Sequence, residues 1–166
     1  GIDIIRVFDA LNDVRNLETS IKSIKKYNGH CQCAISYTTS PIHTLNYYLE
    51  LIKAMESMGA DSICIKDMAG VLTPYKAYDL VKRIKEITNI PINLHTHCTG
   101  GIAHMIYMKA VEAGVDIIDT AISPLSGGTS QPPTESLALT FSEMERNPNL
   151  DMEKLLEVSE HFKPIR

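Results

Sequence analysis

Two histidines separated by a single residue are the strongest chemical signal in this sequence. His95 and His97 end a short segment, 92–97, that predicts a strand, and Thr-Gly-Gly follows as a loop. Because side chains alternate along a strand, both imidazoles should share one face at its carboxyl end, where α/β proteins place their chemistry. Such a pair can bind one divalent metal ion at about 2.0–2.1 Å from each ring nitrogen. The alternative is two hydrogen-bonded histidines at a strand end, and the loop that follows favours the metal site.

A lysine at the end of the preceding predicted strand belongs with these histidines. Lys66 closes the segment 61–66, whose inner positions are mostly apolar, and burying an unpaired ammonium is costly. Three explanations stay open: an ion pair with Asp67 or Asp9, an amine that forms a Schiff base, or an amine that carries CO₂ as a carbamate. The carbamate would add an anionic oxygen ligand to two neutral imidazoles.

The elements that must position these side chains alternate between strand and helix. Successive strand ends are separated by 29, 28, 29 and 24 residues, at Asp9, Thr38, Lys66, His95 and Asp119. This alternation predicts a parallel sheet. Because several strands end in polar residues and no glycine-rich phosphate loop follows the first one, we expect a (β/α)₈ TIM barrel and not an open doubly wound sheet. A full barrel takes about 250 residues, so residues 1–166 should form a fragment cut at Gly1, with five central βα units, roughly barrel strands 3 to 7.

Local signals give approximate boundaries. Besides the histidine strand, strands are expected at 2–8, 31–37, 61–66 and 115–121. Proline is favoured at the first position of a helix, so Pro41 predicts the start of the second helix. Thr73 with Pro74, and Asp151, are expected to cap later helices.

The composition limits the classes of function. The chain has 166 residues, 44% of them apolar and 22% charged, with a formal charge of −4. No signal peptide is visible and no segment has the roughly 18 uncharged apolar residues of a membrane helix, so we expect a cytoplasmic protein without direct membrane insertion. Scattered lysines give no basic stripe for nucleic acid. The four cysteines fall in or at the end of predicted strands and are expected to be reduced core residues.

Four segments resemble the carboxyltransferase domain of biotin-dependent enzymes. They are RVFDALN at 6–12, IKDMAG at 65–70, HTHCTGG at 95–101 and SGGTSQP at 126–132. They follow one another in the order of that family, which includes the α subunit of oxaloacetate decarboxylase and the corresponding subunit of two-subunit pyruvate carboxylase. Cys98 resembles that branch, since single-chain carboxylases tend to have aspartate there.

The resemblance implies a divalent metal ion, commonly zinc, manganese or cobalt, held by two histidines, a carboxylated lysine and an aspartate. His95, His97 and Lys66 match three of these ligands, and the aspartate belongs to a barrel strand that is not in this sequence. The candidate residues for the reaction itself have two roles: Lys66, Cys98 and Asp9 as catalytic, and Arg6, Thr99 and Gln131 as substrate-binding. Structural roles remain open alternatives for Arg6, Asp9 and Cys98.

The activity that the resemblance implies is carboxyl transfer between oxaloacetate or pyruvate and biotin. No Met-Lys-Met biotin attachment motif is present, so biotin should arrive on a separate domain or subunit, with any membrane association through a partner. A homo-oligomer is expected. The alternatives are a metal-dependent aldol-type lyase or acyl-CoA condensing enzyme of the same barrel superfamily, and a catalytically silent fragment of the parent enzyme.

Overall fold

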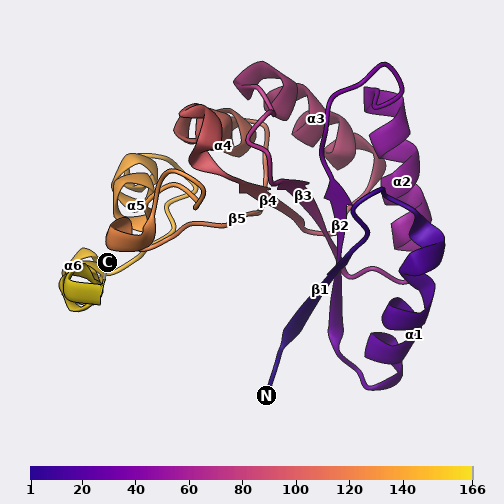
Figure 1. Cartoon of the computed structure of the whole chain (residues 1–166), viewed down its shortest axis with the longest axis horizontal. Helices are drawn as coiled ribbons and strands as arrows, with labels where there is room; N and C mark the ends of the chain where they lie inside the picture. The colour runs from indigo at the N-terminus through magenta and orange to yellow at the C-terminus, as the bar shows by residue number, and fades with distance from the viewer. Residues whose placement is uncertain (166) are drawn as a thin grey trace.

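The strands of this computed structural model, which describes residues 1–165, pair in the order in which they occur in the sequence (Figure 1). All neighbouring strands are parallel, as the alternation of strands and helices predicted. The strands are β1 (Ile4–Phe8), β2 (His30–Ser36), β3 (Ser62–Asp67), β4 (Ile92–Thr96) and β5 (Ile117–Ile118). The carboxyl ends of the strands therefore lie along one edge of the sheet.

The helices follow the strands along one side of the sheet. Figure 1 shows α1 to α4 in chain order along that side, with α5 and α6 beyond β5. The α-helices are α1 (Glu18–Lys26), α2 (Leu45–Ser57), α3 (Pro74–Ile87), α4 (Ala103–Glu112), α5 (Thr134–Ser142) and α6 (Met152–Phe162). Short 3₁₀ turns are η1 (Val14–Asn16), η2 (Cys98–Gly100), η3 (Ser123–Leu125) and η4 (Lys163–Ile165). None of the helices between residues 1 and 165 is long and apolar enough to span a membrane.

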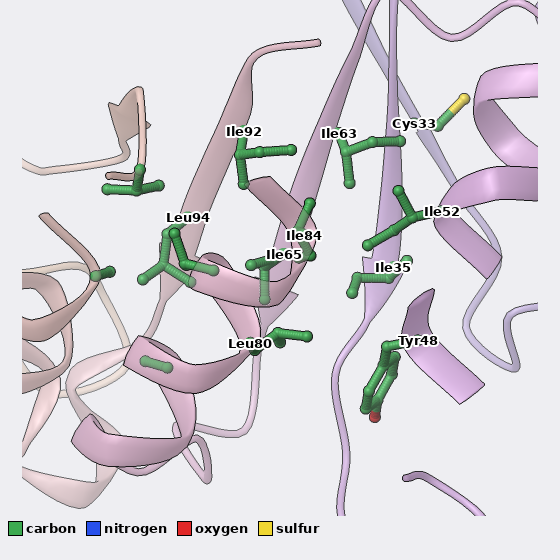
Figure 2. Packing of buried hydrophobic residues seen from close by; sticks show 14 of the residues in the cluster. Cys33, Ile35, Tyr48, Ile52, Ile63, Ile65, Leu80, Ile84, Ile92 and Leu94 are labelled. Carbon is green, nitrogen blue, oxygen red and sulfur yellow. The ribbon is translucent and has the colours of Figure 1, made fainter. Parts of the chain in front are cut away.

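The hydrophobic core lies between the sheet and the helices. In Figure 2, Ile63 and Ile65 of β3 pack near Ile52 of α2 and near Leu80 and Ile84 of α3. Burying an aliphatic side chain of this size stabilises the fold by about 1.5–3 kcal/mol. Because side chains alternate along a strand, this packing directs every second residue of β3 and β4 to the other face of the sheet, away from the helices.

Two predicted boundaries are wrong. Pro41 does not begin the second helix: α2 starts at Leu45, where the Thr44 hydroxyl accepts a hydrogen bond from the Tyr47 amide at 3.2 Å. The threonine hydroxyl satisfies a free amide of the first helical turn. Proline has no side-chain oxygen that could do so. The predicted strand 115–121 is reduced to β5, because the chain then turns and the Ala121 amide bonds the Pro132 carbonyl at 3.0 Å.

Other local predictions are confirmed. Thr73 occupies the N-cap position of α3, with Pro74 in the first turn, although the Thr73 side chain makes no capping hydrogen bond. The Asp151 carboxylate caps α6 by accepting a hydrogen bond from the Lys154 amide at 3.2 Å. All four cysteines are free thiols, and those at 31, 33 and 64 are buried.

Candidate active site

The two histidines at the end of β4 direct their rings toward each other. His95 Nε2 and His97 Nε2 are 3.1 Å apart. The opposite nitrogens face hydrogen-bond acceptors: His95 Nδ1 lies 2.8 Å from Asp119 Oδ2, and His97 Nδ1 lies 2.5 Å from the Thr129 carbonyl oxygen. A carboxylate and a carbonyl have no proton to donate, so each Nδ1 carries one. In this tautomer of the neutral rings the two Nε2 atoms face each other with their lone pairs, which suit a metal ion, a proton or an N–H donor such as the Gln131 amide, 3.4 Å from His95 Nε2.

The spacing of these nitrogens suits a shared metal ion. With bonds of about 2.0–2.1 Å, two nitrogen ligands of one ion lie about 2.9 Å apart at a right angle and about 3.3 Å apart at a tetrahedral angle. The separation of 3.1 Å falls between these values. In the part of the chain that the structure describes, no group of three or more His, Cys, Asp or Glu side chains is arranged to hold a metal. A metal ion bound by this pair would therefore need further ligands that are of another kind or that come from elsewhere.

Lys66 is the register partner of His95 on the neighbouring strand, so both side chains leave the same face of the sheet. Its Nζ lies 4.6 Å from the centroid of the Phe8 ring, and among residues 1–165 it forms no ion pair. Asp67 instead accepts hydrogen bonds from the amides of Val71 and Leu72, both at 3.0 Å. The open alternative of an ion pair with Asp67 or Asp9 is therefore not what the structure shows. Burial of the amine lowers the pKa of Lys66.

A layer of hydrogen-bonded polar side chains lies on the same face of the sheet, one step before the histidines. Arg6 donates to Gln32 at 2.6 Å, to Asp119 at 2.7 Å and to Asn93 at 3.2 Å. Asn93 donates to the second oxygen of Asp119 at 2.8 Å. Burial alone would raise the pKa of Asp119, but the hydrogen bonds from His95, Arg6 and Asn93 hold it well below its usual range.

Three members of this layer, Gln32, Asn93 and Asp119, were not predicted as site residues. The signal for Asn93 was present in the sequence, since it lies two residues before His95 and therefore on the same strand face. Gln32 is likewise a polar residue between two cysteines of a buried strand. Asp119 was identified only as a strand end.

The loop after η3 closes over the histidine strand. The Ser130 carbonyl accepts a hydrogen bond from the Cys98 amide at 2.8 Å, next to the contact between Thr129 and His97. Gln131 Nε2 lies 3.4 Å from His95 Nε2. The predicted substrate-binding residue Gln131 thus lies directly beside the histidine pair.

The remaining predicted site residues lie in the loop after β1 and in η2, which follows His97 directly. Asp9 is engaged in its own loop, where its carboxylate accepts hydrogen bonds from the Leu11 amide at 2.9 Å, the Asp13 amide at 3.0 Å and Asn16 Nδ2 at 2.9 Å. These bonds lower the pKa of Asp9, that from Asp13 most. Cys98 is partly buried, which raises the pKa of its thiol, and Thr99 is exposed in η2.

Comparison with known proteins finds relatives that are named as carboxylases and carboxyltransferases. It is 55% identical to a pyruvate carboxylase subunit of Methanocaldococcus jannaschii and 46% identical to the methylmalonyl-CoA carboxyltransferase 5S subunit of Propionibacterium freudenreichii subsp. shermanii. All of this chain is matched in both, but only 29% and 33% of those proteins. The chain thus spans about a third or less of these curated relatives.

Solved structures agree with this comparison. The carboxyl transferase domain of Rhizobium etli pyruvate carboxylase, solved with pyruvate and biocytin, superimposes with a TM-score of 0.97 at 43% identity over 100% of this chain and 29% of that one. The fold class predicted from the sequence, consecutive βα units of a TIM barrel, is thereby confirmed. The model of the HMGL-like family matches residues 8–161, and the chain belongs to that family.

Proposed function

We propose that this chain supplies the metal-binding part of a carboxyltransferase active site that moves a carboxyl group between oxaloacetate or pyruvate and biotin. The observation that carries the proposal is the pair of Nε2 atoms of His95 and His97, 3.1 Å apart, with an acceptor oxygen next to each Nδ1 atom. The relatives support the reaction class, since they are named as a pyruvate carboxylase subunit and a carboxyltransferase subunit. Pyruvate and biocytin in the Rhizobium etli structure support the substrates.

His95 and His97 would hold a divalent ion, zinc, manganese or cobalt, through their Nε2 atoms. Lys66 would add an anionic oxygen as a carbamate, and an aspartate outside this chain would complete the ligand set. A neutral amine is the form that reacts with CO₂, so the lowered pKa of Lys66 and its lack of an ion pair within residues 1–165 favour carboxylation. When bound, the ion would act as a Lewis acid toward the carbonyl oxygen of a 2-oxo acid.

We retain the other candidate residues as parts of this proposal. Gln131 is the best placed to contact substrate, because its amide lies 3.4 Å from His95 Nε2. Arg6 would have to exchange one of its present partners to bind a carboxylate, whereas Thr99 is exposed and free to do so. Cys98 and Asp9 would act from the rim of the site, through a thiol beside His97 and a carboxylate in the first loop.

The wider assembly is part of the same proposal. Residues 1–166 would form barrel strands 3 to 7 of a cytoplasmic homo-oligomer, with biotin delivered by a separate carrier domain or subunit. Membrane association would occur only through a partner subunit. On its own the chain would be catalytically silent, since the aspartate ligand lies elsewhere.

A second acceptor has support in one relative. The chain is 44% identical to the 2-oxoglutarate carboxylase large subunit of Hydrogenobacter thermophilus. That name favours 2-oxoglutarate as an alternative to pyruvate, and competition between the two oxo acids in a carboxylation assay distinguishes them.

The test is to measure metal content and biotin-dependent oxaloacetate decarboxylation in the full-length protein. We expect about one divalent ion per site, lost in H95A/H97A, and turnover that requires biotin. The variant K66Q should lose turnover. Unchanged turnover in K66Q would instead favour the aldol-type lyases and acyl-CoA condensing enzymes, which share the histidine pair but usually lack this lysine.

A further inference from the structure

Asp119 connects the proposed metal site to the polar layer beneath it. One oxygen of its carboxylate, Oδ2, accepts hydrogen bonds from both Arg6 Nη1 at 2.7 Å and His95 Nδ1 at 2.8 Å. The other oxygen, Oδ1, accepts from Asn93 Nδ2 at 2.8 Å. Arg6 is held in turn by Gln32 at 2.6 Å. The carboxylate is therefore fixed by donors on three sides, and His95 is the only one of them that faces the proposed metal.

The Asp119 carboxylate affects the chemistry of the His95 ring as well as its orientation. The acceptor at Nδ1 determines which nitrogen of an imidazole carries the proton, and a carboxylate at this position leaves Nε2 unprotonated and makes it a stronger donor to a metal ion. His97 has a neutral acceptor in the same place, the Thr129 carbonyl. The two ligands thus differ: a partly buried carboxylate supports His95, and a loop carbonyl supports His97.

We propose that Asp119, anchored by Arg6 and Asn93, is the positioning residue of the metal ligand His95. Its carboxylate contacts Nδ1, on the side of the ring opposite the Nε2 pair, so it acts on the ion through His95 and is not itself a ligand. This role rests on the proposed metal site. An asparagine at 119 has one acceptor atom in place of two, so it cannot satisfy Arg6, Asn93 and His95 together.

The matched control is Asp116, which lies just before β5. Its side chain is 28% exposed against 26% for Asp119, and it pairs with Lys85 at 2.9 Å. It also accepts a hydrogen bond from the Ile92 amide at 2.8 Å, at the opposite end of β4. Within residues 1–165 Asp116 forms no hydrogen bond or ion pair with a histidine, so D116N removes a comparable anion without disturbing His95.

The experiment measures the Zn²⁺ affinity of the full-length protein by competition with a chromophoric chelator, together with the melting temperature of the metal-free form. We expect D119N to bind Zn²⁺ about 10- to 100-fold more weakly than wild type. D116N should retain the wild-type affinity, even if its melting temperature falls by as much as that of D119N. Wild-type affinity in D119N, or an equal loss in D116N, overturns the role of Asp119.

Two further measurements separate the possible failures. D119N leaves the Arg6 guanidinium without its anion, and the single variant can fail to fold for that reason. In that case Zn²⁺ affinity is measured on the double variant R6Q/D119N, which removes both charges. The double variant should show the same loss of affinity, and wild-type affinity in it overturns the role. If wild-type protein binds no Zn²⁺, or H95A/H97A binds it equally well, the proposed function itself fails; if the histidines are required and D119N is normal, only the role of Asp119 fails.

Discussion

Gly70 lies directly against the backbone carbonyl of His97. A Cβ atom at position 70 would be 2.7 Å from that oxygen, and the backbone there has φ +66°, in the left-handed region. The loop after β3 thus holds the loop after β4 by backbone contact, and the His97 amide also bonds the Asp67 carbonyl at 3.1 Å. The position of the second histidine therefore depends on a residue with no side chain in the preceding βα unit.

Replacing Gly70 with alanine should displace His97 and weaken metal binding. Both the contact with the carbonyl and the positive φ oppose a side chain at position 70. The backbone strain of a non-glycine residue at positive φ alone costs about 1–3 kcal/mol. G101A is the matched control, because Gly101 has φ +71° but a Cβ atom at that position would meet nothing within 4 Å. Both variants should lose stability in chemical denaturation, but only G70A should lose Zn²⁺ affinity. Equal affinity in the two variants would show that His97 does not depend on Gly70.

Asp119 should make the metal-free protein sensitive to acid. Hydrogen bonds from His95, Arg6 and Asn93 lower the pKa of Asp119 in the folded state, so its stabilisation is present above the unfolded-state pKa of about 3.9 and is lost as the pH falls through the folded value. We expect the melting temperature of wild type to exceed that of D119N at neutral pH, and the difference to shrink below about pH 4. Thermal unfolding in the presence of a chelator measures this, and a difference that is constant with pH would contradict it.

The core behind the histidines should be sensitive to truncation. Leu94 is fully buried on the helix side of β4, between Asn93 and His95, which face the other way. L94A should reduce the free energy of unfolding by about 2–5 kcal/mol, through lost burial and the cavity left behind. L139A is the control, since Leu139 is 62% exposed on α5 and its truncation should change stability by no more than about 0.5 kcal/mol. Urea denaturation compares the two.

The sequence was most informative where a single periodicity decides the structure. Alternation along 92–97 placed His95 and His97 on one face, and the regular spacing of strand ends gave the parallel order of the sheet. Boundaries were less predictable where a competing local interaction decides them, as at Pro41, where the cap at Thr44 sets the start of α2. The predicted strand 115–121 is likewise shortened, since the Ala121 amide bonds the Pro132 carbonyl and not a residue of β4.

The polar layer was harder to predict because it joins residues that are distant in the sequence. Arg6 and Asp119 are separated by 113 positions, and no local pattern indicates that they pair. Asn93 could have been found from its strand face, but its partners follow only from strand order and register. A site residue whose function depends on an acceptor several strands away thus requires the structure.

Carboxylation of Lys66 predicts that metal affinity depends on dissolved CO₂. If the amine becomes a ligand only as a carbamate, Zn²⁺ affinity of the full-length protein should fall in CO₂-depleted buffer and recover when bicarbonate is added. K66Q cannot form a carbamate, so its affinity should be low and independent of bicarbonate. The control K82Q alters a lysine of α3 that lies over the Tyr78 ring at 5.8 Å, and should respond as wild type does. Because no turnover is measured, bicarbonate acts here only on the ligand and not as a substrate; an affinity that is unaffected by CO₂ in wild type would exclude the carbamate and favour the free amine.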